Sequence, residues 1–214
     1  MTRKFKALVL GASGLVGKAL VNQLCRDDRY AQVTCLVRTP LQQRDYYDPE
    51  GKIQAIVIDF DYLQDFQGYF SVDHVYCCLG TTIKQAGSQS AFRRVDFQFV
   101  HVAAQLTRGQ RAKSFVWISS VGANAKSKNF YLRVKGELEN AILSMPQLDN
   151  AAAVRPSLLI GERAETRFAE NMGISFAKFL SPIMRGPLAK YRPVSAAQVA
   201  RQMIELQVFE KTEH

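Results

Sequence analysis

The sequence predicts an α/β protein built on a doubly wound parallel sheet. Short apolar runs rich in β-branched residues alternate with amphipathic, helix-like stretches as far as about residue 161. The runs are apolar throughout rather than at every second position, which is typical of parallel strands covered on both faces. A glycine-rich turn joins the first of these runs to the first helix-like stretch. These observations favour a repeated strand–helix–strand arrangement in one sheet.

The predicted elements follow one another with short connections. The predicted strands are FKALVLG (5–11), VTCLVR (33–38), IQAIVIDF (53–60), HVYCCLG (74–80), SFVWISS (114–120) and AAAVRPSLLIG (151–161). The first predicted helix is GLVGKALVNQLCRD (14–27), with an apolar face of Leu15, Ala19, Val21, Leu24 and Cys25. Further helices are predicted from about Ser90 to Thr107, over NFYLRVKGELENA (129–141) and over VSAAQVARQMIEL (194–206).

The strand–helix rhythm breaks after Gly161. Residues 162–192 combine an amphipathic stretch with three prolines and are too few to form a domain of their own. We therefore expect residues 1–214 to form a single domain, in which residues 162–192 make a small cap on the substrate side. The cap should cover the carboxyl edge of the sheet, where ligands of such folds bind.

Composition argues against several partners. The formal net charge is +9 and the pI is about 9.5, but Lys and Arg are scattered rather than interleaved with aromatics, so we expect no nucleic-acid binding. No apolar run reaches the ~18–20 residues that span a bilayer, so we expect no membrane partner. The N-terminus resembles a signal peptide without a convincing cleavage site, and a cytoplasmic protein is predicted.

Neither the cysteines nor the histidines have the spacing of a metal site. The four cysteines, Cys25, Cys35, Cys77 and Cys78, contain no CxxC pair, and buried thiols in a reducing compartment are expected. Adjacent Cys77 and Cys78 should point to opposite faces of their strand. The three histidines lack metal-ligand spacing, so no metal is predicted.

The turn GASGLVG after the first strand predicts a phosphate-binding loop. Gly11 would permit the tight turn, Gly14 the approach of a pyrophosphate to the backbone, and Gly17 close packing of helix on strand. The N-terminus of the following helix would add partial positive charge. The candidate cofactor-binding residues of this loop are Gly11, Ala12, Ser13, Gly14, Leu15, Val16 and Gly17.

Residues at the ends of later strands complete the predicted cofactor site. Arg38 stands where an acidic residue would select NAD, and a guanidinium suits a 2′-phosphate, so NADP(H) is favoured. Asp59 and Phe60 should lie at the adenine edge. Leu79 and Gly80 should lie beside the nicotinamide ribose, where glycine allows close approach.

Tyr131 and Lys135 are candidate catalytic residues. Their i, i+4 spacing places them on one helix face, and the helix follows a strand ending in Ser119 and Ser120. An ammonium close to a phenol favours its ionised form, which assists proton exchange at neutral pH. A serine hydroxyl can hydrogen-bond a substrate oxygen on which charge develops. The alternative is a surface tyrosine lying over a lysine stem.

These motifs resemble the short-chain dehydrogenase/reductase superfamily, a group with the Rossmann fold, in its atypical NADP-binding branch. More closely, the sequence is similar to the Tat-interacting-protein oxidoreductase family and its bacterial relatives. The matching segments cover about three quarters of the chain: LGASGLVG, CCLGTT, KQAG, FRRVD, ISSVGA, NFYLRVKGELE and VRPSLLIGER.

The resemblance implies roles for individual residues. Tyr131 would be the proton donor and acceptor, and Lys135 would hold the cofactor ribose and favour the phenolate. Ser120, in preference to Ser119, would orient the substrate. Asp96 in FRRVDF stands where the wider superfamily often has an asparagine.

Two functions are consistent with these residues. The first is an NADP(H)-dependent oxidoreductase that moves hydride between nicotinamide and a carbonyl or alcohol substrate. The second is an NADP(H)-binding regulatory or sensor protein without substantial turnover. A small-molecule substrate is the expected partner, and a protein partner or a homodimer is left open.

Overall fold

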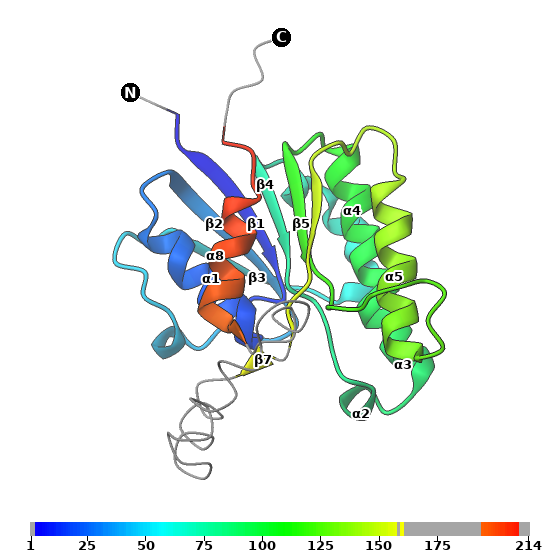
Figure 1. Ribbon diagram of the computed structural model, residues 1–214. Coiled ribbons are helices and arrows are strands. Elements are labelled where there is room, and N and C mark those ends of the chain that lie inside the picture. The colour runs from blue at the N-terminus through cyan, green and yellow to red at the C-terminus, as the bar shows by residue number, and fades with distance from the viewer. Residues whose placement is uncertain (1–2, 158, 161–193, 210–214) are drawn as a thin grey trace, which may run out of the picture.

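The computed structural model describes residues 3–157, 159–160 and 194–209, and its core is one parallel sheet (Figure 1). The six strands of this sheet are β1 (Phe5–Leu10), β2 (Tyr30–Val37), β3 (Ile53–Val57), β4 (His74–Cys77), β5 (Ser114–Ile118) and β6 (Ala151–Val154). They lie in the order β3-β2-β1-β4-β5-β6, and every neighbouring pair is parallel. The predicted doubly wound sheet is confirmed. Strands β2 and β3 are added outward on one side of β1, and the chain then returns to add β4, β5 and β6 on the other side, so the strand order reverses between β1 and β4.

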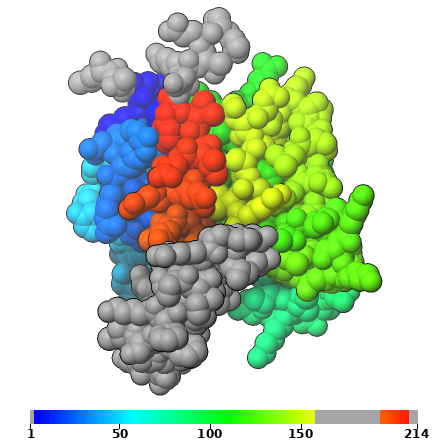
Figure 2. Space-filling model, in the orientation of Figure 1, coloured from blue at the N-terminus to red at the C-terminus, as the bar shows by residue number. Residues whose placement is uncertain are grey.

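Helices cover both faces of the sheet. One face carries α1 (Leu15–Arg26) and α8 (Ala196–Glu205), and the other carries α4 (Val100–Gly109), α5 (Phe130–Leu143) and the 3₁₀ helix η2 (Phe60–Phe70) (Figure 1). Figure 2 shows α8 at the surface between the N-terminal elements and the segment containing β6. The adjacent Cys77 and Cys78 pack on opposite sides of the sheet, as predicted.

Short elements connect these layers. They are the 3₁₀ helix η1 (Gln43–Asp45), α2 (Ile83–Ala86), α3 (Gln89–Arg93), the π-helical segment η3 (Arg94–Phe99), and the paired strands β7 (Leu159–Ile160) and β8 (Val194–Ser195). Ser195 also caps α8: its hydroxyl accepts a hydrogen bond from the Gln198 N–H, and the Gln198 side chain accepts one from the Ser195 N–H. The predicted cap, residues 162–192, lies outside the described residues.

Several predicted boundaries were wrong. The third strand ends at Val57, because the Asp59 carboxylate accepts a hydrogen bond from the Asp61 N–H and starts η2. The helix predicted from Ser90 to Thr107 is divided by η3. Strand 151–161 is interrupted around Pro156, which has no N–H for a ladder. The prediction that every strand is covered on both faces is confirmed for the central strand β4, which is buried. It was wrong for the edge strand β3, which is largely exposed.

A buried polar cluster ties the C-terminal segment to the amino edge of the sheet. His74 Nε2 lies 2.7 Å from the Val208 carbonyl oxygen, and His74 Nδ1 lies 2.7 Å from the Tyr30 hydroxyl. A carbonyl only accepts, so Nε2 carries the proton and Nδ1 accepts from Tyr30. Burial lowers the pKa of His74 from 6.5 to about 4, which keeps the imidazole neutral.

None of the helices in the described part of the chain is long and apolar enough to cross a membrane.

The buried polar cluster around His74 should make stability depend on pH. Below about pH 6.5 the unfolded chain binds a proton at His74 that the folded state excludes until about pH 4. The free energy of unfolding should therefore fall, by up to about 1.4 kcal/mol per pH unit, as the pH drops through that window. Urea unfolding at a series of pH values measures this slope. His74→Gln should flatten it, and an unchanged slope in that variant would show that other groups cause it.

Candidate functional site

The turn between β1 and α1 is closely packed against neighbouring backbone. Gly11 has φ +79°, a conformation that favours glycine, and a Cβ there would lie 2.7 Å from the Cys78 carbonyl group at the end of β4. A Cβ on Gly17 would lie 2.1 Å from the Gly11 carbonyl oxygen. Gly14 is the N-cap of α1 and supplies no side-chain cap, and no acidic residue occupies the first turn. The first-turn N–H groups are thus available to a phosphate.

Gly17→Ala should therefore destabilise the fold. The methyl group would overlap the Gly11 carbonyl, and separating helix from strand should cost roughly 3 kcal/mol of unfolding free energy. Gly14→Ala is the matched control: its Cβ would lie 3.4 Å from the same oxygen, and its cost should be about 1 kcal/mol or less. Urea unfolding of both variants makes the comparison. Equal stability of the two variants would contradict this account of the turn.

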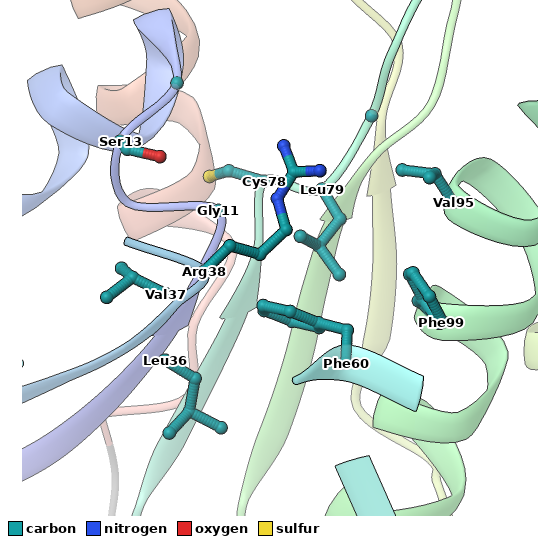
Figure 3. A pocket seen from close by; sticks show the side chains of 12 residues that line it. Gly11, Ser13, Leu36, Val37, Arg38, Phe60, Cys78, Leu79, Val95 and Phe99 are labelled. Carbon is teal, nitrogen blue, oxygen red and sulfur yellow. The ribbon is translucent and has the colours of Figure 1, made fainter. Parts of the chain in front are cut away.

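A groove opens at the reversal point between β1 and β4, the place where doubly wound sheets bind ligands. Figure 3 shows it between the glycine turn, the end of β2 and the segment after β4. It is lined by Gly11, Ser13, Gly14, Leu36, Val37, Arg38, Phe60, Cys78, Leu79, Gly80, Val95 and Phe99. The groove thus brings together residues from five separate segments, and its glycine cradle fits a dinucleotide phosphate.

Half of the fourteen predicted cofactor-binding residues, which included Tyr131 and Lys135, line this groove. The seven that do not are Ala12, Leu15, Val16, Gly17, Asp59, Tyr131 and Lys135. The Arg38 side chain reaches from the end of β2 into the space between the glycine turn and Leu79 (Figure 3). Phe60 lies in the wall beside it, whereas Asp59 is an exposed helix cap. Ala12, Val16 and Gly17 are buried in the turn and in α1. Leu15 is 43% exposed, so its prediction as part of the apolar face of α1 was wrong.

Of the catalytic candidates, Lys135 lies next to the groove, and none is among the residues that line it. Tyr131 is in the first turn of α5, and its ring centroid lies 5.6 Å from that of buried Phe92. Lys135 is 3% exposed, and its Nζ lies 3.4 Å from the Ile118 carbonyl oxygen at the end of β5. A Cβ on groove residue Gly80 would lie 4.0 Å from Lys135 Nζ. Lys135 is therefore buried rather than exposed on the helix surface, and the roles of Tyr131 and Lys135 stay predictions.

Both candidate serines follow β5 and are largely buried. Ser119 is 2% exposed and Ser120 is 8% exposed. The Ser120 hydroxyl donates a hydrogen bond of 3.3 Å to the Val121 carbonyl. Ser119 Oγ has no hydrogen-bond partner among the described residues. The preference for Ser120 over Ser119 stays a prediction.

Asp96 makes a direct contact with Lys135 that the sequence did not predict. Asp96 Oδ1 lies 2.7 Å from Lys135 Nζ, and the carboxylate is only 1% exposed. Burial raises the pKa of Asp96, while the Lys135 ammonium and the Thr81 N–H oppose that rise. The residue lies in π-helical η3, and π-helical turns inside helices are frequent at functional sites.

Gly136 is a second residue whose importance was missed. A Cβ there would lie 2.3 Å from the Ala125 amide nitrogen and from the Asn124 carbonyl carbon. The loop after Ser120 can therefore rest directly on α5, next to Lys135. An isolated glycine inside a helical stretch is a signal for such close approach.

Desolvation raises the pKa of all four thiols, although Cys78 is only partly buried and lines the groove. The pKa of Cys25, Cys35 and Cys77 rises to about 12, and that of Cys78 well above its usual value. In the described part of the chain no cluster of three or more His, Cys, Asp or Glu side chains could hold a metal ion.

The parallel sheet, the glycine turn and the groove at the reversal point define a Rossmann-fold protein of the dinucleotide-binding class. The sequence profile of the family described as NAD(P)H-binding matches residues 11–165. The chain belongs to this NAD(P)H-binding family, and it is related to the protein HTATIP2.

Individual relatives support this assignment. Protein HTATIP2 of Rattus norvegicus is 33% identical over 169 residues, which cover 78% of this chain and 68% of the relative. The mitochondrial protein FMP52 of Candida albicans is 29% identical over 203 residues, or 92% of this chain and 85% of the relative. An oxidoreductase of the short-chain dehydrogenase/reductase family from Burkholderia thailandensis has the same fold, with a TM-score of 0.66 at 21% identity and coverage of 97% and 87%.

Proposed function

We propose that the protein is an NADP(H)-dependent oxidoreductase that transfers hydride between nicotinamide and a carbonyl or alcohol carbon. The observation that carries the proposal is a single groove with the glycine turn and Arg38 in its walls, and with Lys135 next to Gly80 at its far end. This arrangement supports an extended dinucleotide along the carboxyl edge of the sheet, with its reactive end toward α5.

Each end of the groove would hold one part of the cofactor. Gly11, Ser13 and Gly14 with the N-terminus of α1 would bind the pyrophosphate through backbone N–H groups. Arg38 would bind the 2′-phosphate with charge-assisted hydrogen bonds, and Phe60 would lie against the adenine. Leu79 and Gly80 would contact the nicotinamide ribose.

The catalytic step would use three side chains of α5 and the β5 loop. The nicotinamide ring supplies or accepts the hydride when bound. The Ser120 hydroxyl would donate a hydrogen bond to the substrate oxygen, and the Tyr131 hydroxyl would give that oxygen its proton in the reductive direction. Lys135 would contact the ribose and favour the phenolate that remains on Tyr131.

Arg38→Gln tests the cofactor preference. NADPH affinity should fall about ten- to a hundredfold, because hydrogen bonds between charged groups are lost, and NADH affinity should stay nearly constant. Calorimetric titration with both cofactors measures this. Arg44→Gln is the matched control, since exposed Arg44 hydrogen-bonds the Gln42 side chain in the next loop. An equal loss for NADPH and NADH, or a wild type that prefers NADH, would contradict the NADP(H) assignment.

Turnover is tested separately from binding. NADPH oxidation should be measured with a panel of aldehydes, ketones and quinones, and at least one should be reduced. Micromolar NADPH binding without any oxidation would instead favour a sensor or regulatory protein. Cytoplasmic location is also a proposal, to be tested by cell fractionation, since the FMP52 relatives are named as mitochondrial.

A further inference from the structure

Asp96 joins three segments of the chain at the reactive end of the groove. It lies in η3, its Oδ2 accepts a hydrogen bond of 2.8 Å from the Thr81 N–H, and its Oδ1 lies 2.7 Å from Lys135 Nζ. Thr81 follows the groove residues Leu79 and Gly80. One carboxylate therefore fixes both the loop after β4 and the lysine of α5.

The ammonium of Lys135 has a defined direction because of these contacts. An ammonium has three N–H donors. Within the described part of the chain, the Ile118 carbonyl oxygen accepts a hydrogen bond of 3.4 Å from Nζ, and Asp96 Oδ1 forms an ion pair with Nζ at 2.7 Å. A Cβ on Gly80 would lie 3.4 Å from Asp96 Oδ1 and 4.0 Å from Lys135 Nζ. Lys135 Nζ therefore lies next to Gly80 and keeps N–H donors for a ligand in the groove.

Stability alone does not explain the pair. Asp96 and Lys135 are 1% and 3% exposed, so both charges give up most of their hydration. A buried ion pair is seldom more stabilising than apolar side chains of similar volume. The presence of the Asp96–Lys135 ion pair therefore needs a reason other than stability. Holding Lys135 in a fixed position beside the ligand groove is such a reason.

We propose that Asp96 is a positioning residue that builds the nicotinamide-ribose half of the cofactor site. It holds Lys135 Nζ next to Gly80, and it holds the Leu79–Thr81 loop through the Thr81 amide. This inference rests on the cofactor part of the proposed function. It is independent of whether the protein catalyses hydride transfer.

The test compares two probes that fill different lengths of the groove. NADPH reaches the Asp96 end, whereas 2′,5′-ADP carries the adenosine and 2′-phosphate without nicotinamide. Asp96→Asn keeps the size of the side chain and an acceptor for Thr81 but removes the charge that holds Lys135. We expect NADPH affinity to fall about tenfold and 2′,5′-ADP affinity to be unchanged, both by calorimetry. Asp61→Asn is the matched control, because it removes an aspartate that pairs with Arg94 at the surface, and it should alter neither affinity.

Three results would overturn the proposal. The first is an NADPH affinity of Asp96→Asn equal to that of the wild type. The second is a parallel loss of NADPH and 2′,5′-ADP affinity in Asp96→Asn, which general destabilisation would cause. The third is a loss of NADPH affinity in Asp61→Asn as large as that in Asp96→Asn. If Asp96→Asn does not fold, Asp96→Glu allows the same comparison. It keeps the negative charge but moves it by one methylene, and NADPH affinity should again fall while 2′,5′-ADP affinity stays unchanged. A wild type that binds neither probe would mark failure of the proposed function itself.

Discussion

Replacing Tyr131 by phenylalanine is expected to lower the rate of NADPH oxidation by about 10²–10⁴-fold and to leave NADPH affinity nearly unchanged. The variant loses only the hydroxyl that would protonate the substrate oxygen. The ring is retained, and with it the contact with Phe92, whose ring centroid lies 5.6 Å away. Steady-state kinetics with a reducible carbonyl compound, together with calorimetry, separate the two effects.

The matched control is Tyr47→Phe. Tyr47 is 53% exposed in the loop after β2, where its ring lies under Arg26, and loss of its hydroxyl should change neither rate nor affinity. If Tyr131→Phe kept the wild-type rate, Tyr131 would have no role as acid or base. If it lost NADPH affinity and rate in the same proportion, the hydroxyl would act in binding instead.

Lys135→Met is expected to lower the free energy of unfolding by about 3–5 kcal/mol, because it leaves the Asp96 carboxyl buried without its partner. Combining it with Asp96→Leu should restore most of the lost stability, since apolar residues can replace a buried ion pair. Urea unfolding of the two single variants and the double variant measures the coupling. NADPH binding should stay weak in the stable double variant, which separates stability from cofactor binding.

The loss in free energy of unfolding caused by Lys135→Met should also depend on pH. Burial raises the pKa of Asp96, and loss of the neighbouring ammonium removes the main opposing effect. The folded variant should then bind a proton at Asp96 at a pH where the unfolded chain does not, so its stability should rise as the pH is lowered. A deficit that is constant between pH 5 and 8 would show that lost packing, rather than the unpaired carboxylate, is responsible.

Features that depend on local pattern were predictable from the sequence. The strand–helix alternation and the three glycines of GASGLVG predicted the sheet, the tight turn after β1 and its place at the groove, because each depends on neighbouring residues. Arg38 was also placed correctly, since the end of a strand next to the turn has a fixed location in this fold. Asp59 was misplaced because its side chain forms a local helix cap, which ended the third strand early.

The contacts that shape the reactive end were not predictable in the same way. Asp96 and Lys135 are on different helical elements, and no periodicity relates them. The π-helical turn that carries Asp96 has no sequence pattern of its own, so it was predicted as part of one continuous helix. The close approach of the Asn124–Ala125 loop to Gly136 likewise depends on how the loop after β5 returns across α5.

The pairing of β7 with β8 has an evolutionary consequence. Leu159 and Ile160 lie beside Val194 and Ser195, so two parts of the chain that are distant in sequence are paired side by side. Each doubling in length of a stretch joined in this manner costs only about 0.6 kcal/mol of closure entropy. Insertions and deletions between these two strands can therefore be tolerated at little cost to the stability of the fold.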